Sequence, residues 1–139
     1  MTQVVFIPWS GPSGNKSYAG KHWSKRRREA HAGHYHTKIA AKKAGLEAVP
    51  GAVELVFVPQ VGKGGRRLDC SNYSYAAKII EDGLVLAGIL PGDEPWRVSA
   101  VSVAAPIRDR SAGPGMWVII RSPQLGELAH EIVADELRP

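Results

Sequence analysis

The stretch 72-NYSYAAKIIEDGLVLAG-88 decides the fold of this chain. Its apolar residues recur at intervals of three, four and seven, which is the spacing of one face of an α-helix; they are Tyr73, Ala76, Ala77, Ile80, Leu84 and Ala87. Gly88 follows directly, where a glycine typically ends a helix. The pattern therefore predicts a helix over residues 72–87 that packs on a sheet.

Apolar segments on either side of this helix predict the strands of that sheet. Residues 3–8 and 52–59 are rich in β-branched side chains, and each segment ends at a proline. Further strands are expected at residues 96–105 and 115–121, joined by a turn.

A second helix is expected over residues 24–44, with Ser24 as its N-cap and Gly45 as its C-cap. The order β-α-β-α-β-β predicts an α+β fold in which two main helices pack on a small mixed β-sheet. Residues 1–123 are expected to form one domain. Residues 124–139 form a tail whose periodicity indicates a weak terminal helix.

The charge of the chain is distributed unevenly. The net charge is +5, and 12 of the 18 Lys and Arg residues precede Leu68, whereas ten of the 13 Asp and Glu residues follow it. Such a basic field attracts polyanions, because binding releases their counterions. The favoured interpretation is nucleic-acid binding; an acidic membrane surface and a merely solvated helix face are the alternatives.

The candidate DNA contacts lie in and beside this basic half. They combine cations and polar side chains with one aromatic ring that can stack on an unpaired base: Asn15, Lys16, Lys21, Trp23, Lys25, Arg26, Arg27, Arg28, Lys63, Arg66, Arg67 and Asn72. The glycine-rich Gly62–Gly65 loop lacks the Gly-Lys-Ser/Thr ending of a phosphate-binding loop, so no nucleotide cofactor is expected.

The sequence also indicates a compartment. Cys70 is the single cysteine, so no internal disulfide can form, which fits a reducing cytoplasm. No apolar run approaches the roughly 20 residues of a membrane helix, and no export signal is visible. A soluble, cytoplasmic protein that does not act at a membrane is expected.

Acidic residues at both ends of the 72–87 helix suggest a metal site. Asp69 precedes the helix, and Asp93 and Glu94 follow it, with Lys78 between them. Carboxylates of this kind suit Mg²⁺, and a nearby lysine can hold a phosphate. Because a helix of this length spans about 24 Å, the acids meet only if the 88–95 segment folds back or if they come from two subunits. The plainer interpretation is an N-cap followed by an ordinary turn.

The order of these residues resembles the RusA family of phage and bacterial Holliday junction resolvases. The matching features run from Arg66 to Val98: a basic pair, Asp69-x-Ser71-Asn72, a helix lysine, Asp82-Gly-Leu84, Ala87-Gly88 and an acidic pair. An N-terminal Pro12-Ser13-x-Asn15, followed by His22-Trp23-x-x-Arg26-Arg27, is also similar to phage members. With the order of elements, the resemblance spans about residues 3 to 121.

The resemblance implies a homodimer that cleaves branched DNA, with four-way junctions as its substrate and Mg²⁺, or Mn²⁺ as a substitute, as its cofactor. By position, Asp69 corresponds to the first metal-binding aspartate, Lys78 to the helix lysine, and Asp93 or Glu94 to the last carboxylate. Ser71 stands where the family has a second aspartate, and a serine can reach a metal only through its hydroxyl or a bound water. Candidate replacements for the lost carboxylate are Glu54 and Asp82, although Asp82 can equally pair with Lys78.

Three functional hypotheses follow. The first is a magnesium-dependent endonuclease that cleaves Holliday junctions in recombination, repair or phage DNA processing. The second is a RusA-fold protein that binds branched DNA and cuts it weakly or not at all because of Ser71. The third is a general basic protein that binds DNA or RNA without a metal site.

Overall fold

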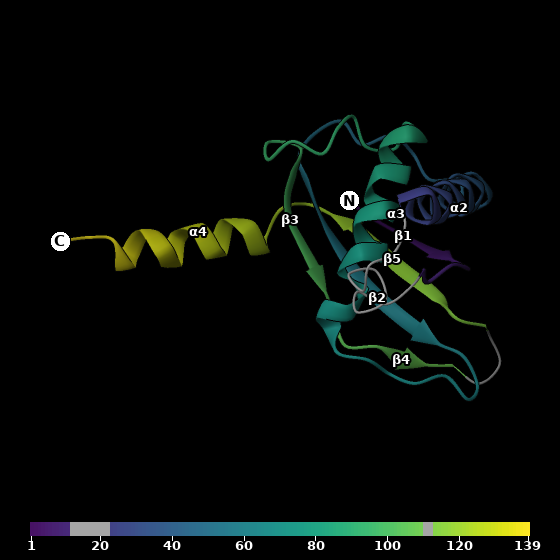
Figure 1. Cartoon of the computed structure of the whole chain (residues 1–139). Coiled ribbons are helices and arrows are strands. Elements are labelled where there is room, and N and C mark those ends of the chain that lie inside the picture. Colours follow the sequence, from purple (N-terminus) through teal and green to yellow (C-terminus); the bar gives the residue numbers. More distant parts are fainter. Residues whose placement is uncertain (12–22, 110–112) are drawn as a thin grey trace.

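A computed structural model of the chain describes residues 1–11, 23–109 and 113–139. Figure 1 shows a mixed sheet with helices packed against it and a terminal helix that projects outward. The elements are β1 (Thr2–Ile7), α2 (Trp23–Lys43), β2 (Val53–Val61), a 3₁₀ turn η1 (Cys70–Tyr73), α3 (Ser74–Leu86), β3 (Val98–Val103), β4 (Ile107–Arg108), β5 (Gly115–Arg121) and α4 (Leu125–Glu136). The expected α+β fold with a small mixed sheet is confirmed.

The sheet has the strand order β1-β5-β2-β3, and β4 pairs with the far end of β2. β5 is antiparallel to both of its neighbours, β1 and β2, whereas β3 and β4 run parallel to β2. The chain therefore reaches β3 from β2 by a crossover, and α3 supplies it.

The hydrophobic core lies between α3 and one face of the sheet. α3 buries its apolar face, including Ile80 and Leu84, which are fully buried. From the sheet, Leu55 and Phe57 of β2 and Val118 of β5 are equally inaccessible. One face of α3 is thus held against the sheet, which leaves the polar side of the same helix available for the candidate site.

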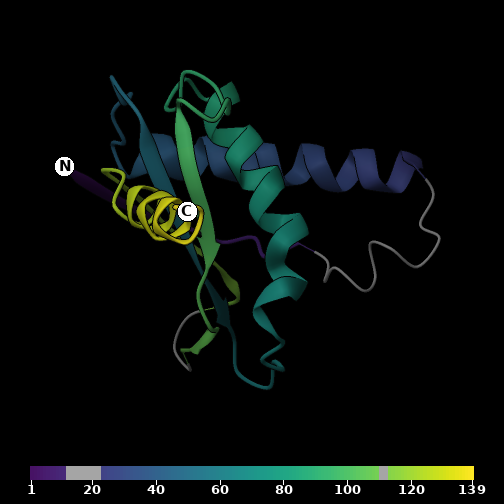
Figure 2. The ribbon, with the colours of Figure 1, turned by 90° about the vertical axis from the view of Figure 1, so that its left-hand side faces the viewer.

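α2 crosses α3 closely, and two glycines permit this contact. A Cβ atom at Gly83 would lie 2.9 Å from Cβ of Thr37, and one at Gly33 would clash with Ile79. Figure 2 shows that the beginning of α2 extends well beyond the sheet. The exposed basic residues at this end of α2 are therefore held on a rigid helix.

The ends of the elements agree with most of the sequence signals. Gly45 and Gly88 have φ angles of 67° and 76° and end α2 and α3, as expected from their lack of a Cβ. The N-cap prediction for Ser24 was wrong, because α2 already includes Trp23. The first turn predicted for the second main helix is a 3₁₀ turn, η1. Among the described residues, no helix is long and apolar enough to cross a membrane.

α4 begins at a buried carboxylate. Glu54 of β2 is 1% exposed, and its Oε2 accepts hydrogen bonds from the backbone N–H groups of Gln124 at 3.0 Å and Leu125 at 2.8 Å. Its Oε1 accepts a hydrogen bond from Arg121 Nε at 2.5 Å. Burial alone would raise the pKa of Glu54, but the hydrogen bonds from Gln124, Arg121 and Leu125 outweigh burial and lower it. Glu54 thus satisfies backbone donors at the start of α4.

Replacing Glu54 with Gln is expected to lower the free energy of unfolding at neutral pH by about 1–2 kcal/mol, because a neutral amide makes weaker hydrogen bonds to these donors. The folded-state pKa of Glu54 lies below its ordinary value of 4.5. Its stabilisation is therefore complete above that pH and is lost as the pH falls through the folded-state pKa. Urea unfolding of both proteins at neutral pH and at about pH 3 measures the effect.

The exposed Glu47 offers a matched control. Glu47→Gln is expected to change the free energy of unfolding by less than about 0.5 kcal/mol at either pH. An equal loss of stability for Glu54→Gln at both pH values would contradict the role of the ionised Glu54 carboxylate.

Candidate functional site

The segment after α3 folds back along that helix. Gly88 reverses the chain, and the side chains of Ile89 and Leu90 are then buried in the core. The backbone N–H of Leu90 donates to the carbonyl oxygen of Leu84 at 3.3 Å, which holds the reversal against α3. The sequence left two ways for the acids to meet: a fold-back of residues 88–95, or a site shared by two subunits. For Asp93, the structure shows the fold-back within one chain.

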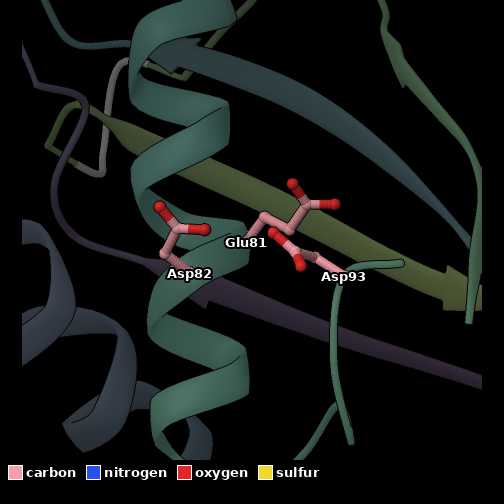
Figure 3. Close-up of side chains that lie close together, drawn as sticks. All are labelled: Glu81, Asp82 and Asp93. Atoms are coloured by element: carbon pink, nitrogen blue, oxygen red, sulfur yellow. The ribbon is translucent and has the colours of Figure 1, made fainter. Parts of the chain in front are cut away.

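The fold-back brings Asp93 to the polar side of α3. Carboxylate oxygens of Glu81, Asp82 and Asp93 lie within 4.8 Å of one another. Figure 3 shows Glu81 and Asp82 on successive positions of α3, with Asp93 approaching from the returning loop. We call these three residues the acidic group.

Lys78 is bonded to all three members of the acidic group. Its Nζ lies 2.8 Å from Asp93 Oδ2, 3.0 Å from Asp82 Oδ1 and 3.2 Å from Glu81 Oε1. The ion pair between Lys78 and Asp82 that their spacing predicted is therefore present. The ammonium of Lys78 occupies the position where these oxygens would otherwise receive a cation.

The pKa values reflect this arrangement. The hydrogen bond to Asp93 is the main cause that raises the pKa of Lys78, and the bonds to Asp82 and Glu81 add to it. The same bond to Lys78 lowers the pKa of the exposed Asp93. Burial raises the pKa of Glu81, and Lys78 offsets this only in part. The acidic group therefore holds a cation strongly and contains one carboxylate that takes up a proton more readily than usual.

Glu94 and Asp69 lie in other surroundings. Glu94 pairs with Arg97, with 3.1 Å between Glu94 Oε2 and Arg97 Nε. Asp69 is exposed at the start of η1, where its carbonyl oxygen, and not its carboxylate, accepts the hydrogen bond from Asn72. Ser71 is exposed in the same turn. Within residues 1–11, 23–109 and 113–139, the acidic group is the one set of three metal-binding side chains, and it includes neither Asp69 nor Glu94.

The predicted DNA contacts that the structure describes lie on two segments. Trp23 and the four cations Lys25, Arg26, Arg27 and Arg28 are exposed in the first turns of α2. Lys63, Arg66 and Arg67 are exposed in the loop that joins β2 to η1, and Asn72 is half-buried in η1. Asn15, Lys16 and Lys21 lie outside the described residues, as do Pro12, Ser13 and His22 of the family-like motif.

Two hollows are lined in part by site residues predicted from the sequence. One, of about 250 Å³, is lined by Lys63 and Arg66 of the basic loop and by Tyr73 of η1. The second, of about 270 Å³, lies between α3 and β3 and is lined by Lys78 and Glu81 together with Val101 and Val103. The acidic group therefore borders an open groove, from which an ion or a phosphate can approach Lys78.

Glu81 was not among the site residues predicted from the sequence. The signal for it was present, because Glu81 and Asp82 stand three and four residues after Lys78 and so lie on the same side of a helix. What the spacing could not supply was Asp93, whose position depends on the burial of Ile89 and Leu90. Glu54, considered as a replacement ligand, instead caps α4.

The acidic group has donors that suit a hard divalent cation. Its ligand atoms are carboxylate oxygens, and Mg²⁺ is typically bound through one or two carboxylates while it keeps several waters. A cation that enters here must displace Lys78 from at least one carboxylate. Comparison with protein-family models gives no match, and no curated protein is significantly similar to this chain.

Lys78→Met is expected to raise the pKa values of both Glu81 and Asp93. The reason is that each carboxylate loses the ammonium that favours its charged form and stays close to the other two. Carbon-13 NMR of the side-chain carboxyl groups during a pH titration measures both values. Lys42→Met removes an exposed lysine of α2 and is expected to leave both pKa values unchanged. Unchanged values in Lys78→Met would show that the ammonium does not lie among these carboxylates in solution.

Proposed function

We propose that this protein is a magnesium-dependent endonuclease that binds and cleaves branched DNA, as the resemblance to the RusA family implies. The observation that supports the proposal is the acidic group around Lys78, on the helix that begins next to the basic loop. A nuclease needs carboxylates for a metal ion and cations for the DNA backbone. This chain has both on adjoining segments.

The residues that would hold the ion are Asp93 and the two acids of α3. Asp93 is one of the two residues, with Glu94, that match the family's last carboxylate in the resemblance, and Glu81 and Asp82 provide negative charge that Ser71 does not. Bound there, Mg²⁺ would stabilise the negative charge that develops on a scissile phosphate. The family resemblance also predicts Asp69 as a metal ligand. Asp69 precedes η1, which leads into α3.

Lys78 has a role of its own in this proposal. Its ammonium neutralises part of the charge of the acidic group in the absence of a divalent ion. Once displaced from a carboxylate, it is free to donate a hydrogen bond to a phosphate oxygen in the groove between α3 and β3. A lysine in that position stabilises the charge of the transition state.

A second candidate is a protein that binds branched DNA but cleaves it poorly. Two observations favour it: Ser71 lacks the carboxylate of the family's second aspartate, and Lys78 already satisfies the acidic group with a positive charge. A strongly held lysine competes with a divalent ion for the same oxygens. The two candidates share the DNA-binding surface and differ in whether the ion displaces Lys78.

The nuclease proposal predicts that a labelled four-way junction is nicked symmetrically in the presence of Mg²⁺ or Mn²⁺. Asp93→Asn is expected to reduce the cleavage rate by more than about 100-fold. Loss of a direct metal ligand lowers activity more than loss of a residue that only forms a hydrogen bond to a ligand. Glu94→Gln is the matched control and is expected to keep activity, since Glu94 pairs with Arg97. The reverse result would make Glu94 the ligand and would contradict the role of Asp93.

The same assay separates the two candidates. A wild-type protein that binds junctions without cutting them, together with a Ser71→Asp variant that cuts, would establish the second candidate. Loss of cleavage in Asp69→Asn would add Asp69 to the metal site. Equal affinity for a junction and for linear duplex would contradict both candidates.

The basic loop is expected to contact phosphates. Replacing both Arg66 and Arg67 with Ala should weaken binding to every DNA sequence. The plot of log binding constant against log salt concentration has a negative slope, and its steepness should decrease by about 1 for each arginine removed. Fluorescence anisotropy over a series of salt concentrations measures the slope. Arg138 follows α4 and pairs with Asp135. Arg138→Ala is the control and should leave the salt dependence of binding unchanged. An unaltered slope in the double variant would exclude this loop from the interface.

A further inference from the structure

The hollow beside the basic loop is built from three strand ends and η1. It lies where β1 and β2 end and β5 begins, and Figure 1 shows the chain between β2 and η1 at this end of the sheet. Its volume is about 250 Å³. Pockets for drug-sized ligands begin at about 300 Å³, so this space suits one planar ring system and is too small for a base pair. We call it the loop hollow.

The walls of the loop hollow combine apolar surface with positive charge. Lys63 and Arg66 are both exposed, and the described lining residues include no Asp or Glu. Four side chains supply the apolar surface: Val61, Leu68, Tyr73 and Pro114. A nucleotide has the matching parts, because its base presents a flat face that stacks on apolar and aromatic groups, and its phosphate is an anion.

Hydrogen bonds hold these walls in place. The backbone N–H of Gly65 donates to the carbonyl oxygen of Gly62 at 3.0 Å, and Arg108 Nη2 donates to the carbonyl oxygen of Gly65 at 2.7 Å. The backbone N–H of Leu68 donates to the hydroxyl oxygen of Tyr73 at 3.2 Å, and Tyr73 is only 7% exposed. The loop hollow is therefore formed before a ligand arrives, which lowers the entropic cost of binding.

Two glycines keep the loop hollow narrow. A Cβ atom at Gly62 would lie 3.2 Å from Cδ of Pro114, and one at Gly65 would lie 3.1 Å from the carbonyl oxygen of Gly62. Both distances are shorter than an ordinary van der Waals contact, so a larger residue at either position would push the loop away from its neighbours. Glycine at both positions lets the loop stay close to the sheet, as a planar ligand requires.

The loop hollow and the acidic group lie along the same helix. Tyr73 precedes Lys78 by five residues, which is roughly 7.5 Å along an α-helix axis. Successive nucleotides of one DNA strand are about 3.4 Å apart along a duplex. A strand with one phosphate at the acidic group can therefore place a nucleotide about two steps away at the loop hollow. The hollow between α3 and β3 suits a base less well, because Glu81 lines it.

We propose that the loop hollow receives one unpaired nucleobase of bound DNA, turned out of the base stack, and that Lys63 and Arg66 hold the phosphates next to it. Extruding a base is unfavourable, and least so for a base that has no partner. Stacking against the apolar walls offsets this cost. The inference rests on the proposed binding of branched DNA and adds what is recognised at the branch point.

Fluorescence anisotropy with two four-way junctions tests the inference. Both junctions have one unpaired nucleotide at the branch point, which carries adenine in one and is abasic in the other. The wild type is expected to bind the adenine junction about 10-fold more tightly, since stacking of one base contributes affinity of this order. Equal affinity for the two junctions would overturn the inference and leave the proposed DNA binding intact. Failure to bind either junction would contradict the proposed function as well.

A variant that fills the loop hollow should lose this preference. Leu68→Trp is expected to bind both junctions alike, with its affinity for the abasic junction within about two-fold of the wild type, because the phosphate contacts of Lys63 and Arg66 remain. Leu86→Trp adds the same ring at a position that is 69% exposed at the end of α3, and should keep the preference. An unchanged preference in Leu68→Trp would overturn the inference.

Circular dichroism checks that both tryptophan variants fold. If Leu68→Trp does not, Pro114→Trp replaces it, because Pro114 is exposed and lines the same hollow. The expected result and the result that overturns the inference are the same for this variant.

A photochemical cross-link locates the unpaired base. The adenine is replaced by 5-iodouracil, which on illumination forms a covalent bond to an aromatic ring in contact with it. Tyr73 is the one aromatic residue among the described residues that line the loop hollow, so mass spectrometry is expected to find the cross-link in the peptide that contains Tyr73. A cross-link only to Trp23, at the start of α2, would place the base elsewhere and overturn the inference.

Discussion

The structure depends on one constraint: the central strand β2 is apolar on both of its faces, and the described part of the chain provides a full helix layer for only one of them. Leu55 and Phe57 are covered by α3, whereas Val56 and Val58, which alternate with them, remain half-buried. Burial of the first face fixes α3 and, through the reversal at Gly88, the position of Asp93. The second face carries Glu54, which fixes the start of α4.

The same constraint explains why Lys78 lies among the carboxylates of the acidic group. α3 has one side committed to the sheet, so its charged residues gather on the other, where Lys78, Glu81 and Asp82 are neighbours on the helix surface. Asp93 adds a third carboxylate, and one ammonium cannot neutralise three of them. The acidic group therefore keeps a net negative charge beside the groove between α3 and β3, which suits the approach of a divalent ion.

Local signals in the sequence were enough for the elements and for part of the site. Residues 115–121 are a short apolar run rich in β-branched and aromatic side chains, which favours a strand, and Gly45 and Gly88 mark helix ends because a residue without a Cβ readily adopts a positive φ there. The site required information that no local pattern carries. Asp93 lies next to Glu81 because Ile89 and Leu90, which precede Asp93 in the sequence, are buried in the core and turn the chain back along α3. Glu54 contacts the start of α4 because β2 pairs with β5, the strand that leads into α4.

The distribution of charge then connects the two halves of the molecule. The proposed DNA-binding surface on α2 and the basic loop would be more favourable to a polyanion if the four acids of α4 lie away from it. Glu54 directs α4 off the side of the sheet opposite α3, which places those four acids across the sheet from the acidic group. The carboxylates of α3 would then be the acids that remain near bound DNA, where a divalent ion can neutralise them. The sheet thus separates the acids of α4 from those of α3, and of the two sets it is the acids of α3 that surround Lys78.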